Sequence, residues 1–122
     1  MNIGEAASRS GLPTKTIRYY ETIGLVSSTR RANGFRDYGE EAVRKLSFIG
    51  CARSLGFTVE DCRALVDLFE DRSRPPSQTA ALIGEHVDSI RKKVAALRAL
   101  ETALTNVTER TRRTDSIPSL DL

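Results

Sequence analysis

The sequence predicts a mainly α-helical chain: a helix-turn-helix with a small β-wing, then a pair of helices, then one long helix. Three observations carry this prediction. Short helical patterns separated by glycine and proline occupy the positions before Pro75. An Asn33-Gly34 dipeptide, which favours a tight hairpin turn, interrupts them. After residue 77, apolar residues recur every three or four positions without a break, as is typical of a coiled coil.

Composition and charge restrict the class of protein. The 122 residues are 39% hydrophobic and 29% charged, which fits one globular domain with an appendage. No apolar run approaches the roughly 20 residues that cross a bilayer, and Cys51 and Cys62 lack a paired CxxC spacing. We therefore expect a cytoplasmic protein. We find no nucleophile–base pair, paired carboxylates or glycine-rich phosphate loop, and so we expect no enzymatic activity.

The positive charge lies in the N-terminal half. Residues 1–54 carry nine Lys or Arg against five Asp or Glu, whereas residues 55–122 carry ten against eleven. A basic segment joined to a near-neutral one indicates a head that binds a polyanion, attached to a body that binds a partner or senses a signal.

Two short helices are expected first. Asn2 and Glu5 have the spacing of a capping box, and Gly11 is a natural helix end. The next helix is expected to start with Thr14 as its N-cap and to end at Gly24. Two short helices joined by a glycine-containing turn match the helix-turn-helix plan.

A polar loop around Asn33-Gly34 is expected to form the wing. Arg30 and Arg31 precede the turn, and Arg36 and Tyr38 follow it, so a hairpin would bring both groups to one edge. We expect Phe35 to anchor the wing to the third helix.

Two further helices follow the wing. Ala42, Leu46, Ile49 and Arg53 recur at helical spacing before Gly56. In the next helix, Thr58 is the expected N-cap, with Asp61 at the third position. Its expected apolar stripe consists of Val59, Cys62, Leu65, Val66 and Phe69. Pro75 and Pro76 interrupt the helical pattern, after which Ser77 can cap the long helix.

The long helix is expected over about residues 78–107. Its apolar seam comprises Ile83, Val87, Ile90, Val94, Leu97 and Leu104. A helix of roughly 30 residues, about 45 Å long, cannot bury such a seam inside a domain this small. We therefore expect a homodimer. The tail after this helix reads as a loop or a frayed end.

The second helix carries the candidate recognition face. Lys15, Arg18, Tyr19 and Thr22 lie at i, i+3, i+4 and i+7, while Ile17 points away. Cationic side chains and a tyrosine hydroxyl on one face favour contact with double-stranded DNA. Tyr20 can instead be a core aromatic. The full candidate DNA-binding set is Lys15, Thr16, Arg18, Tyr19, Tyr20, Arg30, Arg31, Asn33, Gly34, Arg36 and Tyr38.

Two other readings of this face remain open: an ordinary solvated surface, or a coiled-coil adaptor whose basic head docks on an acidic protein. The wing repeats the basic and aromatic chemistry of the helix, which favours DNA.

The segments "MNIGEAASRSGLPTKTIRYYETIGLV", "NGFRDY" and "RSLGFTVEDCRALV" together resemble the MerR family of winged-helix regulators, and are especially similar to its copper-efflux regulators. The resemblance spans roughly residues 1–107. It implies a long dimerisation helix that forms an antiparallel coiled coil. It also implies a homodimer that binds promoter DNA with an overlong spacer and distorts it for RNA polymerase. The three regions would be a DNA-binding domain with connecting helices at 1–73, a dimerisation helix at 77–108, and an effector-loop remnant or flexible tail at 109–122.

The sequence departs from the copper-sensing pattern at its end. The resemblance implies two cysteines beyond the long helix that clamp Cu(I), but no cysteine follows Cys62. The matching positions are Thr111 and Ser119, or Thr108 and Ser116, which are hydroxyls and poor ligands for a soft cation. The resemblance also implies a serine at the start of the long helix. Either Ser77 or Pro76 stands at the matching position of this sequence. We therefore expect no metal site and no cofactor.

Two explanations of the missing thiolates stay open: engineered replacement of cysteine, or a natural paralogue whose effector is different or absent. A copper-type activator using other ligands would need Cys51, Cys62 and His86 to converge from three helices. A structural role for both cysteines is the simpler expectation.

Overall fold

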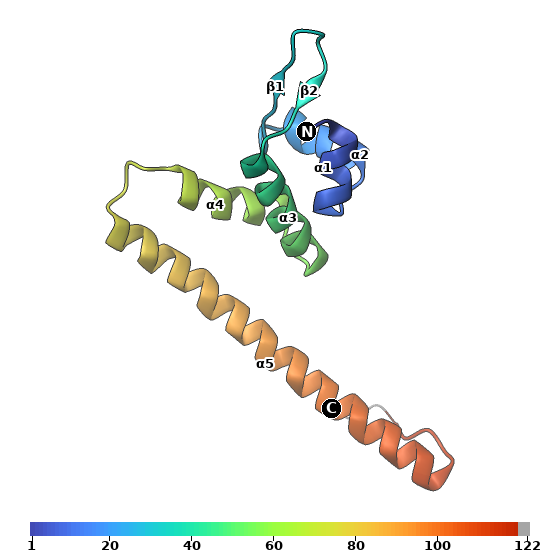
Figure 1. Cartoon of the computed structure of the whole chain (residues 1–122). Coiled ribbons are helices and arrows are strands. Elements are labelled where there is room, and N and C mark those ends of the chain that lie inside the picture. Colours follow the sequence, from blue (N-terminus) through green and yellow to red (C-terminus); the bar gives the residue numbers. More distant parts are fainter. Residues whose placement is uncertain (120–122) are drawn as a thin grey trace. The chain divides into compact units, whose positions relative to one another are not determined.

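The computed structural model describes residues 1–119, and over these it is mainly helical with one two-stranded sheet (Figure 1). The elements in chain order are α1 (Ile3–Ser10), α2 (Thr14–Thr22), β1 (Thr29–Arg30), β2 (Arg36–Asp37), α3 (Glu40–Ser54), α4 (Val59–Glu70) and α5 (Pro76–Thr114). The chain divides into two compact units, Met1–Ser73 and the part from Arg74 onward. This order confirms the predicted helix-turn-helix, wing, helical pair and long helix.

The core of the first unit lies where α1, α2, α3 and the base of the wing meet. Helix α1 packs against α2 and α3, and α3 packs against α4. The buried cluster consists of Ala6, Ile17, Tyr20, Leu25, Val26, Tyr38, Val43, Leu46, Ile49, Ala52, Cys62 and Val66. Because all four helices of the unit and Tyr38, directly after β2, contribute to this cluster, the positions of α2 and the wing depend on one shared core.

The helix ends confirm three of the expected caps and correct two. Asn2 accepts a hydrogen bond from the Glu5 amide at 2.8 Å, and Gly11 ends α1 with φ 76°. The Thr58 hydroxyl and the Asp61 carboxylate each accept the other's backbone amide at 3.0 Å, which completes a capping box.

Helices α2 and α5 start differently from the prediction. Pro13 and Pro75 occupy the N-cap positions, and neither helix has a side-chain cap. The expectations that Thr14 and Ser77 cap these helices were therefore wrong. Pro76, at the first position of α5, has a fixed φ that suits the first helical turn and lacks the N–H group that would need a cap.

The wing is a short antiparallel hairpin in which Arg30 pairs with Arg36. Gly34 turns the chain with φ 85°, a conformation that L side chains rarely adopt. Phe35 does not anchor the wing as we expected, because its side chain is 71% exposed. Tyr38 performs that role: its side chain is fully buried, and its hydroxyl donates to Glu21 Oε2 at 2.9 Å.

The buried stripes of α3 and α4 differ in part from the sequence pattern. Helix α3 buries Val43, Leu46, Ile49 and Ala52, one position away from the expected Ala42 and Arg53 at each end. Phe69 of α4 is 56% exposed and meets Phe48 of α3 edge to face, with ring centroids 6.4 Å apart. Both aromatic rings therefore lie on the surface of the helical pair.

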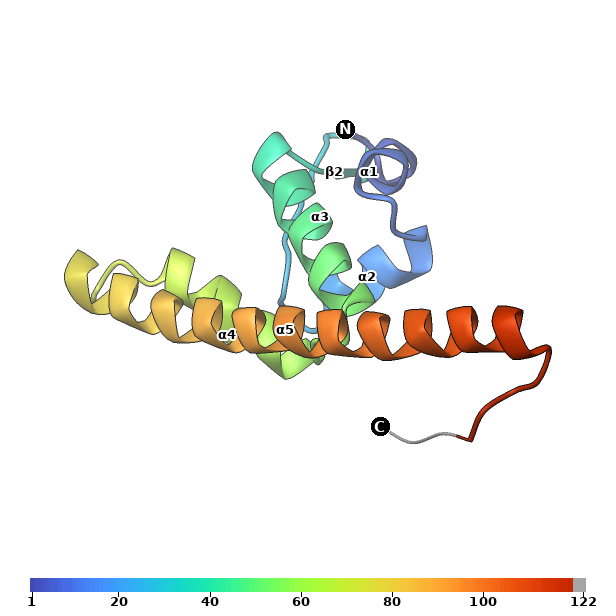
Figure 2. The ribbon, with the colours of Figure 1, turned by 90° about the horizontal axis from the view of Figure 1, so that it is seen from below.

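Helix α5 runs unbroken over 39 residues and buries none of them (Figure 2). It extends past the expected end near residue 107 because residues 109–114 contain neither Gly nor Pro. Asp115 ends it in the left-handed region, with φ 54°. No helix of the described residues is long and apolar enough to span a membrane.

Glu21 links α2 to the wing and gives the first unit a pH-dependent contact. Partial burial raises the pKa of Glu21, but hydrogen bonds from Ser28 and Tyr38 and the charge of Arg36 outweigh it, so that the net pKa lies below its usual 4.5. A carboxyl whose pKa is lower in the folded state stabilises that state above its unfolded pKa. This contribution is lost as the pH falls through the folded value.

We expect Glu21→Gln to lower the free energy of unfolding by about 1–2 kcal/mol at pH 7, since two hydroxyl donors and the Arg36 guanidinium lose a charged acceptor that is partly exposed to solvent. The difference from wild type should narrow as the pH falls below 4.5, where the wild-type carboxyl becomes protonated. Urea unfolding of both full-length chains between pH 7 and pH 3 measures this. A difference that stays constant over that range would contradict the assigned ionic contact.

Candidate nucleic-acid interface

Helix α2 presents a cationic and aromatic face above a buried one. Lys15 and Arg18 are exposed, and Tyr19 is 52% exposed, while Ile17 is fully buried. Thr22 lies on the same face but donates its hydroxyl to the carbonyl of Arg18 at 2.9 Å. Lys15, Arg18 and Tyr19 are thus held outward because the opposite side of the helix is fixed in the core.

Two tyrosines of the candidate DNA-binding set lie in the core. Tyr20 is 5% exposed and Tyr38 is 0% exposed. Burial of both rings favours a supporting role for these residues over direct contact with DNA. Tyr20 follows Ile17 by three positions and so shares its buried face. It also lies beside Tyr19, with ring centroids 5.8 Å apart, so it supports the exposed ring instead.

The arginines of the wing are each held by a local partner. Arg30 donates to the carbonyl of Gly34 at 3.0 Å, and Arg31 pairs with Asp37 at 3.3 Å. The Nε of Arg36 lies 2.9 Å from Glu21 Oε2. These contacts limit the rotamers of three long cationic side chains, so that less conformational entropy would be lost on binding an anion.

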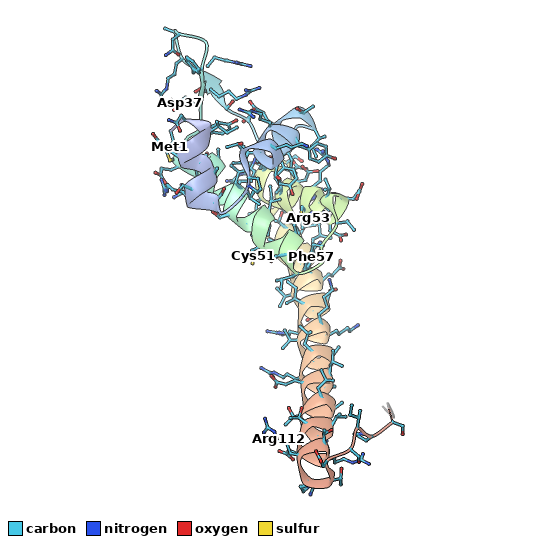
Figure 3. All side chains as sticks on the ribbon, turned by 90° about the vertical axis from the view of Figure 1, so that its right-hand side faces the viewer. Met1, Asp37, Cys51, Arg53, Phe57 and Arg112 are labelled. Atoms are coloured by element: carbon cyan, nitrogen blue, oxygen red, sulfur yellow. The ribbon has the colours of Figure 1, made fainter. Side chains whose placement is uncertain are left out.

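Asn33 and Gly34 shape the turn at the tip of the wing. The side-chain oxygen of Asn33 accepts the amide of Phe35 at 3.1 Å, and the Gly34 amide donates to Arg31 at 2.9 Å. At the base of the wing, the Met1 ammonium pairs with Asp37 at 2.6 Å, where Figure 3 shows both residues. Partners at both ends therefore fix the hairpin.

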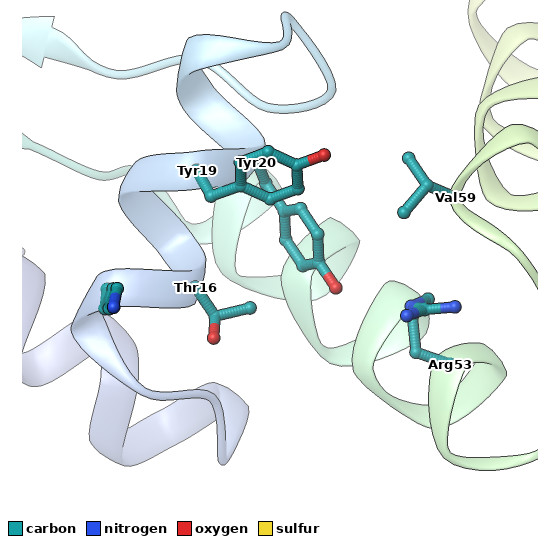
Figure 4. Close-up of a pocket in the computed structure, with 6 residues that line it drawn as sticks. Thr16, Tyr19, Tyr20, Arg53 and Val59 are labelled. Atoms are coloured by element: carbon teal, nitrogen blue, oxygen red, sulfur yellow. The ribbon is translucent and has the colours of Figure 1, made fainter.

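A cleft of about 300 Å³ lies between α2 and the α3–α4 pair (Figure 4). Its lining consists of Lys15, Thr16, Tyr19, Tyr20, Arg53 and Val59. Arg53 was not among the candidate DNA-binding residues. Its guanidinium donates to the carbonyl of Phe57 at 2.7 Å and is exposed (Figure 3). Arg53 therefore adds a positive charge from α3 beside the exposed face of α2.

The residues at the end of α5 do not suit a soft metal ion. The hydroxyls of Thr108 and Thr111 donate to the carbonyls of Leu104 and Val107 at 3.0 and 2.8 Å, and Ser116 is within 3.0 Å of Thr114. Hydroxyl oxygens already used by the helix are poor ligands for Cu(I), which prefers thiolates.

The two cysteines differ in their surroundings. Burial raises the pKa of the Cys62 thiol, which disfavours the thiolate form that binds metal, and Cys51 is exposed on α3. No group of three His, Cys, Asp or Glu side chains that could hold a metal ion occurs among residues 1–119.

Comparison with known proteins gives the family. The sequence matches the "MerR HTH family regulatory protein" family over residues 1–68 and the "MerR, DNA binding" family over residues 43–107. It is 47% identical to the HTH-type transcriptional regulator HmrR of Rhizobium leguminosarum bv. viciae, over 85% of this chain and 81% of that protein. It is 34% identical to the HTH-type transcriptional regulator CueR of Salmonella typhi, over 89% and 80% of the two chains.

The fold agrees with these matches. A crystal structure of a MerR family transcriptional regulator from Listeria monocytogenes superposes with a TM-score of 0.78 at 27% identity, covering 93% of this chain and 86% of that one. The matching proteins are transcription regulators, a family not known for enzymatic activity. Both the sequence matches and the winged helix-turn-helix architecture therefore show that this chain belongs to the MerR family of DNA-binding transcription regulators.

Proposed function

We propose that this regulator binds promoter DNA as a homodimer, with α2 in the major groove and the wing on the adjacent backbone of each half-site. The observation that carries the proposal is the exposure of Lys15, Arg18 and Tyr19 on one face of α2, above the buried Ile17. A helix fits the major groove, where Arg and Lys can donate to guanine, and the remaining cations can pair with phosphates. With DNA as its ligand, the protein would act in the cytoplasm.

Within this proposal, the candidate residues have different roles. Arg18 and Lys15 reach base edges or phosphates, and Tyr19 adds contact area and a hydroxyl. Arg30, Arg31 and Arg36 face the backbone from the wing, while Asn33 and Gly34 set the shape of its tip. Arg53, which lines the cleft beside α2, adds a further cation to this set. Thr16, which lines the same cleft, completes the α2 contribution.

The homodimer is proposed from the surface of α5. Val87, Ile90 and Val94 are 38, 42 and 40% exposed, and Leu97 and Leu104 are 62 and 51% exposed. With Ile83, they repeat at the spacing of a coiled-coil seam. Burial of this seam against a second α5 would remove a continuous apolar strip from water, at about 25 cal/mol per Å². Two half-sites related by the dimer axis would then be bound together.

The effector of this regulator is proposed to differ from that of the copper-efflux branch it resembles. The resemblance implies promoter distortion that RNA polymerase can use, and this chain retains the elements for DNA binding. It lacks thiolates in the last turns of α5 and just beyond them, where Thr108, Thr111 and Ser116 already form local hydrogen bonds. Control by a monovalent soft cation at that end is therefore not part of the proposal.

We expect Arg18→Ala to weaken binding to a duplex that the wild-type chain enriches from a random-sequence pool, by about 1–3 kcal/mol, because Arg18 is central on the exposed face of α2. Fluorescence anisotropy at fixed salt concentration measures the loss. Arg98→Ala, which removes the same charge from exposed α5, is the matched control and should change affinity little. Equal affinity of Arg18→Ala and wild type would refute the docking of α2.

We expect Val94→Asp to dissociate the dimer, because it would place an unpaired charge inside the apolar seam, at a cost of about 3–5 kcal/mol. Sedimentation equilibrium at micromolar concentration measures the dimer constant. Ala96→Asp introduces the same charge on another face of α5 and should leave the dimer intact. A folded monomer in the unmodified protein at that concentration would rule out the dimer.

We expect the unmodified chain to take up no Cu(I) in competition with a high-affinity Cu(I) chelator, because hydroxyls replace the thiolates. The double variant Thr111→Cys with Ser119→Cys, or Thr108→Cys with Ser116→Cys, should acquire measurable uptake. Stoichiometric uptake by the unmodified chain would overturn this expectation, and loss of that uptake in Cys51→Ser would locate the ligand.

A further inference from the structure

We propose that Glu21 is a positioning residue for DNA recognition, which fixes the wing and the guanidinium of Arg36 relative to the exposed face of α2. The inference rests on the proposed binding of DNA by α2 and the wing. Glu21 lies in the last turn of α2, two positions after Tyr19, and its side chain is 21% exposed. It is the one residue of α2 whose side chain is shown bonded to the wing segment within the described residues.

Two hydroxyl donors and one guanidinium of the wing segment converge on this carboxylate. Oε1 accepts the hydroxyl of Ser28, which immediately precedes β1. Oε2 accepts the hydroxyl of Tyr38, just after β2, at 2.9 Å, and lies 2.9 Å from the Nε of Arg36 within β2. Both sides of the hairpin are therefore tied to a single point on the helix. The hairpin has only two residues per strand, and its other contacts with the rest of the unit, those of Met1 with Asp37 and Tyr38 and the burial of Tyr38, all lie at its β2 end.

The contact also determines how Arg36 is presented. The guanidinium approaches Glu21 through Nε, and its two terminal nitrogens are separate donors of the same planar group. A phosphate can accept from those terminal nitrogens while Nε remains paired. Glu21 would thus orient Arg36 for a phosphate without being displaced by it.

A carboxylate at this place has an electrostatic cost. It lies between two basic clusters that would face a polyanion, so its charge opposes binding of any DNA, whatever the sequence. A residue that weakens binding to all sequences but fixes geometry should increase discrimination between sequences. This effect separates a positioning role from a simple contribution to affinity.

Glutamine has one acceptor oxygen and an amide nitrogen that can only donate, so one hydroxyl bond must reverse its direction and the ion pair with Arg36 is lost. Aspartate keeps the charge but withdraws the carboxylate by one methylene. The two substitutions therefore separate charge from geometry: the first weakens the hold on Arg36, and the second moves the acceptor away from all three partners.

The experiment compares two duplexes: one enriched by the wild-type chain from a random-sequence pool, and a scrambled duplex of the same composition. The measured quantity is the ratio of their dissociation constants, determined for full-length chains at several salt concentrations. We expect the ratio to fall about tenfold in Glu21→Gln and in Glu21→Asp, the size of one lost specific contact. Only Glu21→Gln should bind the scrambled duplex more tightly, because only it removes a negative charge.

Glu41→Gln is the matched control, since Glu41 is exposed in the first turn of α3. It should leave the ratio of dissociation constants unchanged. If Glu21→Gln is unfolded at the assay temperature by circular dichroism, Tyr38→Phe, which removes one hydroxyl, decides the question.

If the ratio of dissociation constants in the folded Glu21 variants equals that of wild type, the proposed role of Glu21 is overturned and the proposed function stands. The same holds for Tyr38→Phe where that variant is used instead. A wild-type chain that enriches no sequence and binds both duplexes equally overturns the proposed function, and the role of Glu21 with it.

Discussion

The burial of Tyr38 is the contact on which the DNA-binding unit depends. Its ring lies in the same core as Ile17 and Leu46, and its hydroxyl reaches Glu21 in α2. Its backbone amide also donates to the carbonyl of Met1 at 2.6 Å. One residue thus joins the end of the wing, helix α2 and the N-terminal segment. Because packed cores resist small displacements, the exposed faces of helix and wing are held at a defined spacing.

Much of the first unit could be predicted from sequence because its signals are local. Gly11, Asn33-Gly34 and the Thr58–Asp61 capping box each require only neighbouring residues. The spacing of Ile17 and Arg18 correctly separated the buried face of α2 from the exposed one. Local chemistry was sufficient wherever a single turn or helix face decided the outcome.

The features that could not be predicted from the sequence depend on contacts between elements that are distant in the chain. Phe35 and Tyr38 are both aromatic residues of the wing, and only the tertiary structure shows that Tyr38 is buried and Phe35 is exposed. Arg53 recurred at helical spacing with Leu46 and Ile49 and carried no sequence signal of a binding role, yet it lines the cleft beside α2. Glu21 carried no sequence signal, because its three partners lie 7, 15 and 17 positions further along the chain.

Helix α5 has a consequence for the newly made protein. An isolated helix gains most of its stability from tertiary packing, and α5 buries no residue within its own chain. Until the second chain of the proposed homodimer covers the row from Val87 to Leu104, that helix offers backbone and apolar side chains to proteases and chaperones. The lifetime of the chain then increases with its own concentration. The regulator would therefore need a minimum concentration, below which monomers are degraded faster than they dimerise.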